Sequence, residues 1–241
     1  MRAPAPLAPP PRACRVPTRP AAVIFDMDGL MLDTEPLAAR AWSDAAKEVG
    51  VDFDLAVTRQ LIGRNFPDCR RLIQAHHGDA YPVDELMRAW HRAYDAIVER
   101  DGIVLKPGLP ELLAWLEEAG IPKAVATSTR RARALAKLAL TDLLRRFAAL
   151  VGGDEIACGK PAPDIFLEAA ARLGVAPAAC AVLEDSEPGV NAAFAAGMMT
   201  MMVPDLSPPS AALLARAPLV FASLVEVRVH LAALPPPERV R

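Results

Sequence analysis

The strongest constraint on the fold is an alternation, along most of the chain, between short apolar runs and segments with helical periodicity. The first run is Ala-Ala-Val-Ile-Phe at residues 21–25. It has the length and continuous hydrophobicity of a strand that is buried on both faces of a parallel sheet. Similar runs recur later and predict further strands. The expected strands are residues 21–25, 123–127, 148–151, 180–184 and 199–203, with residues 219–221 as a last edge strand.

The segments between these strands repeat apolar residues with the period of an α-helix. Strands joined by single helices form right-handed crossovers, so their sheet is parallel. The exception follows the first strand, where residues 34–106 have helical texture only. The sequence therefore predicts an α/β fold, a doubly wound parallel sheet with an inserted all-helical cap domain. The expected helices are residues 110–119, 130–140, 163–173, 188–196 and 224–233 in the core and residues 35–49 and 83–99 in the insert.

Proline and arginine set the N-terminal segment apart. Residues 1–20 contain 7 of the 24 prolines and four arginines, with almost nothing apolar to bury. Burial cannot compensate the entropy of ordering such a segment, so we expect a disordered tail. A targeting peptide is the less favoured alternative, because no apolar or amphipathic stretch is present. We expect the α/β core at residues 21–33 and 107–234, the helical cap at residues 34–106, and a second tail at residues 235–241.

Composition excludes several functional classes. The 241 residues are 53% hydrophobic and carry 27 basic against 29 acidic side chains, a formal net charge of −2. That balance offers no basic surface for nucleic acid or an anionic membrane, and no run of about 18 residues is apolar enough to span a bilayer. We expect a cytoplasmic monomer whose partner is a small molecule. Four cysteines without a C-x-x-C pair indicate free thiols in a reducing compartment; they are Cys14, Cys69, Cys158 and Cys180.

Chemically active side chains follow four of the predicted strands. Ligands of open α/β sheets bind outside the carboxyl ends of the strands. We therefore expect these side chains to converge on one site. They are Asp26 and Asp28 after the first strand, Thr127 and Ser128 after the second, Lys160 after the third, and Glu184 and Asp185 after the fourth.

This set of side chains has the chemistry of a phosphoryl-transfer site. Several carboxylates in one crevice raise one another's pKa unless a cation neutralises them, and oxygen ligands without histidine or cysteine suit Mg²⁺. Hydroxyls, backbone N–H groups at a helix start and a lysine bind phosphate. With a metal ion to polarise phosphorus, one aspartate can attack it and form an aspartyl-phosphate. A second aspartate, two residues later, can protonate the leaving oxygen and then activate water.

Each element also has a plainer interpretation. The acids after the first strand could form a turn, and the side chains after the second and fourth strands could cap the helices that follow. Lys160 could be a solvated loop lysine, although it is one of only five lysines against 22 arginines. The joint occurrence of these residues, in order, on successive strand ends favours the catalytic interpretation.

Taken together, these residues resemble the four motifs of the haloacid dehalogenase superfamily. The closest likeness is to the β-phosphoglucomutase-like and sugar-phosphatase branch, which carries a helical cap after the first motif on a Rossmann-like core. It runs from about residue 23 to residue 203, and residues 159–164 and 184–190 are its most specific part. The motifs are Asp26-x-Asp28-Gly29-x-x-x-Asp33, Thr127, Lys160 and Glu184-Asp185.

The resemblance implies a role in phosphoryl transfer for five residues. Asp26 would be the nucleophile and Asp28 the general acid/base. Thr127 and the backbone of Ser128 would hold the phosphoryl group. Lys160 would balance the charge on the nucleophile and the phosphate.

The resemblance also implies a Mg²⁺ site and a brace for the cap. Mg²⁺ would bind Asp26, the Asp28 carbonyl and Asp185. Glu184 would bind it directly or through water. Asp33 would brace the junction to the cap, and it could also cap the helix that follows it.

The cap would close over the site, exclude water and choose the leaving group. Gly63 and Arg64, between two expected cap helices, resemble the substrate-facing loop of such caps. Arg64 is therefore a candidate substrate contact, with an ordinary surface arginine as the alternative. His76 and His77, which precede Gly78, are expected to end a helix rather than to form a catalytic pair.

One departure from the family pattern favours hydrolysis. Mutases of this branch carry a histidine on the first cap helix that helps a sugar, rather than water, meet the aspartyl-phosphate, and the corresponding residue here is Ala38. A dehalogenase would leave Asp28 without a role. We expect a Mg²⁺-dependent phosphatase acting on a small phosphorylated metabolite, with a sugar phosphate favoured. A β-phosphoglucomutase-type hexose-phosphate mutase and a non-catalytic phosphate-ligand-binding protein are the alternatives.

Overall fold

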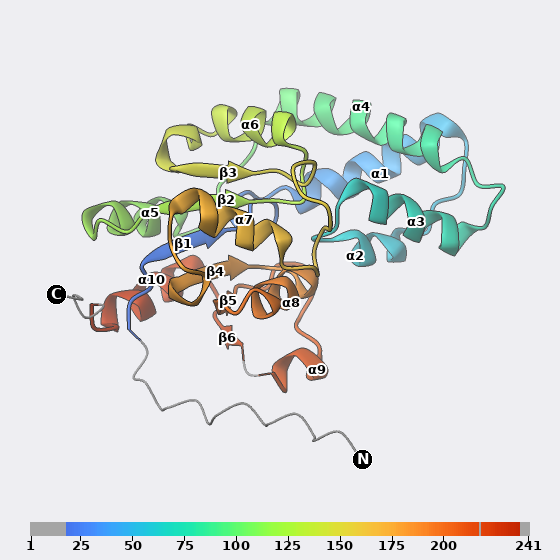
Figure 1. Cartoon of the computed structure of the whole chain (residues 1–241). Helices are drawn as coiled ribbons and strands as arrows, with labels where there is room; N and C mark the ends of the chain where they lie inside the picture. Colours follow the sequence, from blue (N-terminus) through green and yellow to red (C-terminus); the bar gives the residue numbers. More distant parts are fainter. Residues whose placement is uncertain (1–17, 217, 237–241) are drawn as a thin grey trace, which may run out of the picture.

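A six-stranded parallel sheet lies at the centre of the computed structural model, which describes residues 18–216 and 218–236. The strand order is β3-β2-β1-β4-β5-β6, and the predicted α/β fold with a helical insert is confirmed (Figure 1). The strands are β1 (Ala22–Phe25), β2 (Lys123–Ala126), β3 (Ala149–Val151), β4 (Cys180–Glu184), β5 (Met199–Met202) and β6 (Leu219–Val220).

The first strand occupies the point where the chain changes direction across the sheet. β1 pairs in parallel with β2 on one side and with β4 on the other. A crevice at such a switch point is where open α/β sheets bind ligands. Asp26 directly follows β1, so the sheet topology alone places it in that crevice.

Helices cover both faces of the sheet and form the insert between β1 and β2. The expected helices are present within one or two residues of their predicted ends. In the insert they are α1 (Glu35–Val49), α2 (Thr58–Leu61), α3 (Phe66–His77) and α4 (Val83–Asp101). Around the sheet they are α5 (Leu109–Glu118), α6 (Arg131–Leu140), α7 (Asp164–Leu173), α8 (Glu187–Ala195), α9 (Ala211–Leu214) and α10 (Leu224–Ala233).

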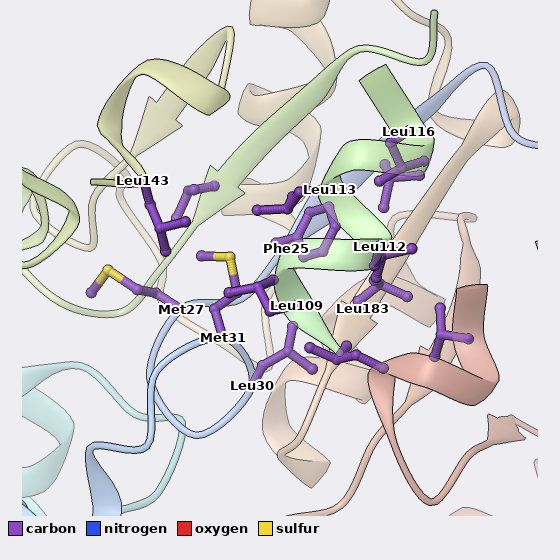
Figure 2. Close-up of a cluster of buried hydrophobic side chains, with 14 of the residues drawn as sticks. Phe25, Met27, Leu30, Met31, Leu109, Leu112, Leu113, Leu116, Leu143 and Leu183 are labelled. Atoms are coloured by element: carbon purple, nitrogen blue, oxygen red, sulfur yellow. The ribbon is translucent and has the colours of Figure 1, made fainter. Parts of the chain in front are cut away.

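Alternate residues of β1 enter two separate cores because side chains of a strand point in turn to opposite faces. Val23 and Phe25 pack with the leucines of α5, and Figure 2 shows Phe25 beside Leu112 and Leu113 in this layer. On the other face, Ile24 packs against α7 and α8. Each buried side chain of this size contributes roughly 1.5–3 kcal/mol, so packing on both faces fixes the strand end that carries Asp26.

The insert has its own aromatic core. Trp42 of α1 lies with its ring centroid 5.2 Å from that of Trp90 of α4 and 5.0 Å from that of Phe53. The α1 helix ends at Gly50, whose φ of 73° is the left-handed conformation that glycine adopts at helix ends. His76 and His77 end α3 before Gly78, as predicted.

The two connections between sheet and insert are held together at one lysine. The Lys106 ammonium lies 3.1 Å from Asp33 Oδ1 and 2.7 Å from Asp205 Oδ1. The Asp33 N–H also donates to the Val104 carbonyl, at 2.9 Å. Thr34, not Asp33, is the residue that precedes α1, and it makes no side-chain cap. The helix-cap interpretation of Asp33 is therefore wrong, whereas the ion pair fits a brace.

The described parts of the two expected tails contact each other. Arg19 donates its N–H to the Pro235 carbonyl at 2.8 Å, and its guanidinium lies over the ring of Trp115. The remainder of both tails, including Cys14, lies outside the described residues. The other three cysteines are free thiols. Among residues 18–216 and 218–236, no helix combines the length and apolarity needed to cross a membrane.

Candidate active site

Lys160 joins the ends of three strands. Its ammonium forms ion pairs with Asp26 Oδ1, after β1, and with Glu184 Oε1, at the end of β4 (2.5 Å). It also lies 3.3 Å from the carbonyl of Ala126, the last residue of β2. The side chain is completely buried, so the interpretation as a solvated loop lysine is wrong. Burial favours the neutral amine, but the two carboxylates outweigh it and raise the pKa of Lys160.

Three acids surround this lysine. Burial, with the nearby charge of Glu184, raises the pKa of Asp26 to about 8 against the opposing effect of Lys160. Burial also raises the pKa of Asp185 well above its usual value, and Glu184 and Asp26 add to the effect. A single ammonium therefore leaves the cluster short of positive charge.

The same acids fit a divalent cation. Asp26, Glu184 and Asp185 each offer a carboxylate oxygen, and these oxygens lie within 4.8 Å of one another. Asp185 Oδ2 is buried and has no hydrogen-bond partner among the described residues. An all-oxygen set of this kind suits Mg²⁺, and a 2+ ion would offset the burial and the mutual repulsion that raise the two pKa values.

Gly29 gives Asp185 the space it occupies. Its φ is 84°, a conformation that side chains rarely adopt, and a Cβ at this position would overlap the Asp185 carboxylate. The glycine of the first motif is therefore required by both backbone conformation and close approach.

Asp28 is held by three donors that the sequence analysis did not identify. The hydroxyl of Thr34 donates to Oδ1 at 2.9 Å, and that of Thr129 donates to Oδ2 at 2.7 Å. The ammonium of Lys137, on α6, lies 2.6 Å from Oδ1. Burial alone would raise the pKa of Asp28, but Lys137 and the two hydroxyls outweigh it and lower that pKa.

Lys137 also contacts the insert. Its ammonium lies 5.0 Å from the ring centroid of Tyr94 on α4, within the range of a cation–π contact. Lys137 is one of the five lysines of the chain. That scarcity, which singled out Lys160, is the sequence signal that could have drawn attention to Lys137.

The expected helix caps on the strand ends are not formed. Thr127 Oγ1 accepts a hydrogen bond from the N–H of Thr129 at 3.1 Å, and Arg130, not Thr127, precedes α6. Ser186 caps α8 by accepting from the Gly189 N–H, while Glu184 Oε2 accepts from the N–H and the hydroxyl of Ser186. The cap interpretations of these strand-end residues are wrong.

The insert touches the site through Gly63. Its carbonyl accepts a hydrogen bond from Ser128 Oγ at 2.8 Å. Its φ is 74°, and a Cβ there would overlap the Ser186 side chain. Two strand-end loops therefore meet one glycine of the insert. Arg64, the next residue, donates its Nε–H to the Gln60 carbonyl at 3.0 Å, and its contact with substrate stays a prediction.

A cavity of about 660 Å³ lies between these parts. Asp26, Asp28 and Thr127 form its floor on the sheet side, and Arg64 and Ala38 line it from the insert. Its remaining lining includes a group of aromatic side chains from the insert, which are Trp42, Phe66, Trp90, His91 and Tyr94.

Comparison with known proteins shows that this chain belongs to one family of hydrolases. A model of the haloacid dehalogenase-like hydrolases matches residues 20–197. β-Phosphoglucomutase of Bacillus subtilis is 36% identical over 76% of this chain and 82% of its own length. Fructose-1-phosphate phosphatase YqaB of Escherichia coli is 36% identical over 75% of this chain and 94% of its own length.

Two further relatives extend the likeness. The bifunctional riboflavin kinase/FMN phosphatase of Arabidopsis thaliana is 33% identical over 89% of this chain, but the match spans only 56% of that protein. The crystal structure of CbbY from Rhodobacter sphaeroides in complex with phosphate superposes with a TM-score of 0.73 at 29% identity. It covers 86% of this chain and 96% of that one.

Proposed function

Because this chain belongs to the haloacid dehalogenase-like hydrolases, we propose that it is a Mg²⁺-dependent phosphatase. It hydrolyses a small phosphorylated metabolite of the sugar-phosphate class through an aspartyl-phosphate. The observation that carries the proposal is the position of Asp26, at the switch point of the sheet, in contact with Lys160 and within reach of Asp185. The likeness to two relatives, a fructose-1-phosphate phosphatase and a bifunctional riboflavin kinase/FMN phosphatase, supports it.

In this proposal Asp26 is the nucleophile. One of its carboxylate oxygens attacks phosphorus while Lys160, paired with Asp26 Oδ1, balances the charge on nucleophile and phosphate. The Thr127 hydroxyl, which only accepts in the structure, still has its proton to donate to a phosphoryl oxygen. The Ser128 N–H provides a second donor in the same loop.

Asp28 is the general acid/base. Its carboxylate lies in the same cavity as Asp26 and is oriented by Thr34, Thr129 and Lys137. It passes a proton to the leaving oxygen in the first step and takes one from water in the second. Because Lys137 and the two hydroxyls lower its pKa in the free protein, the proton of the first step enters with the substrate, as the monoanion of the phosphate ester. The three donors fix where that proton is given and taken.

Asp26, Asp185, Glu184 and the Asp28 carbonyl would hold the Mg²⁺. When bound, the ion neutralises the acids and stabilises negative charge on the transferring phosphoryl oxygens. The unpartnered, buried Asp185 Oδ2 is the observation that fits this assignment.

Water is the proposed acceptor of the phosphoryl group. Ala38 lines the cavity and presents a methyl group, which cannot help a second sugar hydroxyl to attack. A hexose-phosphate mutase is the second candidate, favoured by the 36% identity to a β-phosphoglucomutase. A non-catalytic phosphate-binding protein is the third, and the complete set of acids and lysine argues against it.

Phosphate release tests the proposal. The purified protein should release phosphate from p-nitrophenyl phosphate and from a panel of sugar phosphates with Mg²⁺, and EDTA should stop it. Asp26→Asn should abolish release and keep the folded circular dichroism spectrum. Asp44→Asn, at an exposed acid of α1, is the matched control and should keep full activity.

Other outcomes of these assays would favour the mutase or the non-catalytic phosphate-binding protein. Interconversion of glucose 1-phosphate and glucose 6-phosphate that outruns hydrolysis would establish the mutase. Binding of inorganic phosphate without turnover of any compound would establish the non-catalytic protein. Activity retained by Asp26→Asn would remove Asp26 as the nucleophile.

A further inference from the structure

We infer that the substrate's alcohol portion carries a planar aromatic ring, which stacks in the cavity on the aromatic side chains of α3 and α4. This inference rests on the proposed phosphatase function and narrows its substrate class. It selects sugar or sugar-alcohol phosphates that bear a heteroaromatic ring, such as nucleoside 5′-monophosphates or FMN, over plain hexose phosphates.

Four aromatic side chains lie in a row along the insert side of the cavity, and Tyr94, at one end of the row, is buried. Phe66 and His91 stack with ring centroids 4.9 Å apart and planes inclined by 17°. His91 meets Trp90 edge-on at 5.1 Å, and Trp90 stacks on Tyr94 at 5.0 Å. All four residues line the cavity that also contains Asp26 and Thr127, so one ligand can reach both the rings and the reacting carboxylate.

Phe66 is not needed for the packing of the insert. It is 38% exposed and belongs to none of the buried clusters of the described residues. By contrast, Trp42 and its neighbours are buried in the aromatic core of the insert. A half-open phenyl ring at the edge of an active-site cavity offers a face on which another ring can stack.

The part of the insert around these rings is mainly apolar. Polar side chains of the insert also line the cavity, namely Glu35, Thr58, Arg59 and Arg64, although Thr58 Oγ1 already donates to the Leu55 carbonyl at 2.6 Å and Arg64 Nε to the Gln60 carbonyl. Aliphatic side chains, Leu61 and Met87 among them, complete this wall. Sugar hydroxyls placed against the aliphatic and aromatic part of this wall would lose hydrogen bonds to water without replacement.

The charge state of His91 points the same way. Burial, followed by the charge of Arg133, lowers the pKa of His91 to about 4. The imidazole is therefore neutral at physiological pH and acts as an aromatic surface rather than as an anion site. The cavity volume of about 660 Å³ is in the middle of the range, roughly 300–1,000 Å³, that encloses drug-sized ligands.

Matched substrates test the inference. Ribose 5-phosphate lacks the ring that uridine 5′-monophosphate and adenosine 5′-monophosphate carry on the same sugar, and FMN carries a larger ring on a sugar alcohol. We expect kcat/KM for at least one of the three aromatic esters to exceed that for ribose 5-phosphate by about tenfold or more, since stacking of one base contributes roughly 1–3 kcal/mol. Equal or better hydrolysis of ribose 5-phosphate and hexose phosphates would overturn the inference.

A variant locates the effect. Phe66→Ala should lower the ratio of kcat/KM between the preferred aromatic ester and ribose 5-phosphate by about fivefold to tenfold. Leu55→Ala is the control, because Leu55 is an exposed apolar residue of the insert that does not line this cavity. It should leave the ratio unchanged. A ratio that Phe66→Ala does not alter would place the ring elsewhere and overturn the assignment to this wall.

A binding measurement separates failure of the inference from failure of the proposed function. Flavin fluorescence can be titrated with the Asp26→Asn protein, and stacking should quench it, less so with Phe66→Ala added. No phosphate release from any compound would contradict the phosphatase. Phosphate release without a preference for aromatic esters, and without flavin quenching, would contradict only the present inference.

Discussion

The Lys137 ammonium lies 2.6 Å from the Asp28 carboxylate, although 109 residues separate the two in the sequence. The same ammonium lies over the ring of Tyr94, on a helix of the insert. Lys137 therefore connects the proposed general acid/base to the part of the molecule that would cover the substrate. This arrangement makes Lys137 a positioning residue, acting through Asp28.

Replacing this lysine should slow proton transfer selectively. We expect Lys137→Met to lower kcat for an alkyl phosphate by about 10- to 100-fold, within the range that general acid–base catalysis contributes. The loss should be smaller with p-nitrophenyl phosphate, whose leaving group needs no proton. Lys47→Met, at an exposed lysine of α1, is the control. Equal losses with both substrates would show that Lys137 has only a structural role.

Two glycines with the same backbone conformation allow the effect of backbone strain to be distinguished from the effect of losing the contact between the insert and the sheet side. Gly63 and Gly50 have φ values of 74° and 73°, but only Gly63 meets the sheet side of the molecule. Gly50→Ala should cost about 1–2 kcal/mol of the free energy of unfolding through backbone strain alone, and Gly63→Ala should cost more because its Cβ also overlaps Ser186. Only Gly63→Ala should also lower kcat/KM, by about tenfold or more, because it displaces the insert from Ser128 and Ser186. Similar activities of the two variants would show that this contact is not needed for turnover.

Metal binding should appear in stability as well as in activity. We expect Mg²⁺ to raise the free energy of unfolding, by about 2.7 kcal/mol at a concentration 100 times its dissociation constant. Asp185→Asn should be more stable than the wild type in EDTA, because one of three neighbouring carboxylates is removed. It should gain little from Mg²⁺. Urea unfolding at matched ionic strength measures both, and an undiminished Mg²⁺ effect in the variant would exclude Asp185 as a ligand.

The pH dependence of stability should report on His91. Burial lowers its pKa to about 4 in the folded protein, whereas an unfolded histidine titrates near 6.5. Between these values the unfolded chain binds the extra proton, so this residue makes stability fall as pH drops from about 6.5 to about 4. The charged groups around it are Arg133, Arg130, Lys137 and Asp95.

A substitution isolates that contribution. His91→Phe keeps an aromatic ring beside Phe66 and removes the titrating group. The difference in the free energy of unfolding between pH 7 and pH 4 should become smaller by about 1–3 kcal/mol. Leu55→Ala, at an exposed residue, retains both His91 and its stacking partner Phe66 and should keep the slope of the wild type. An unchanged slope in His91→Phe would show that other groups set the pH dependence.

The sheet and the core of the candidate site could be predicted because both follow from local patterns. Short apolar runs marked β1, β2 and β4 nearly to the residue, and parallel strands bring their carboxyl ends to one edge. Asp26, Lys160 and Asp185 meet for that reason. Their separation in sequence did not matter, since the sheet supplies the register.

The partners of Asp28 and the aromatic wall could not be predicted in the same way. Lys137 lies in the middle of an amphipathic helix, where a lysine has no local feature that indicates a buried carboxylate partner. Trp90 and Tyr94 follow the apolar spacing of α4 and were consistent with an ordinary helix core. Their position in the cavity depends on how the insert lies against the sheet, a relationship that no pattern within α4 encodes.

The ion pair between Lys106 and Asp33 has a consequence for how related proteins can come to accept different compounds. The chain leaves the sheet region and returns to it at adjacent points, joined by Asp33 and Lys106. The insert is therefore a single segment whose two ends lie side by side. Exchange or redesign of the insert can alter which compound enters the cavity while Asp26 and Asp28 stay in place, because none of the sheet's pairings runs through it.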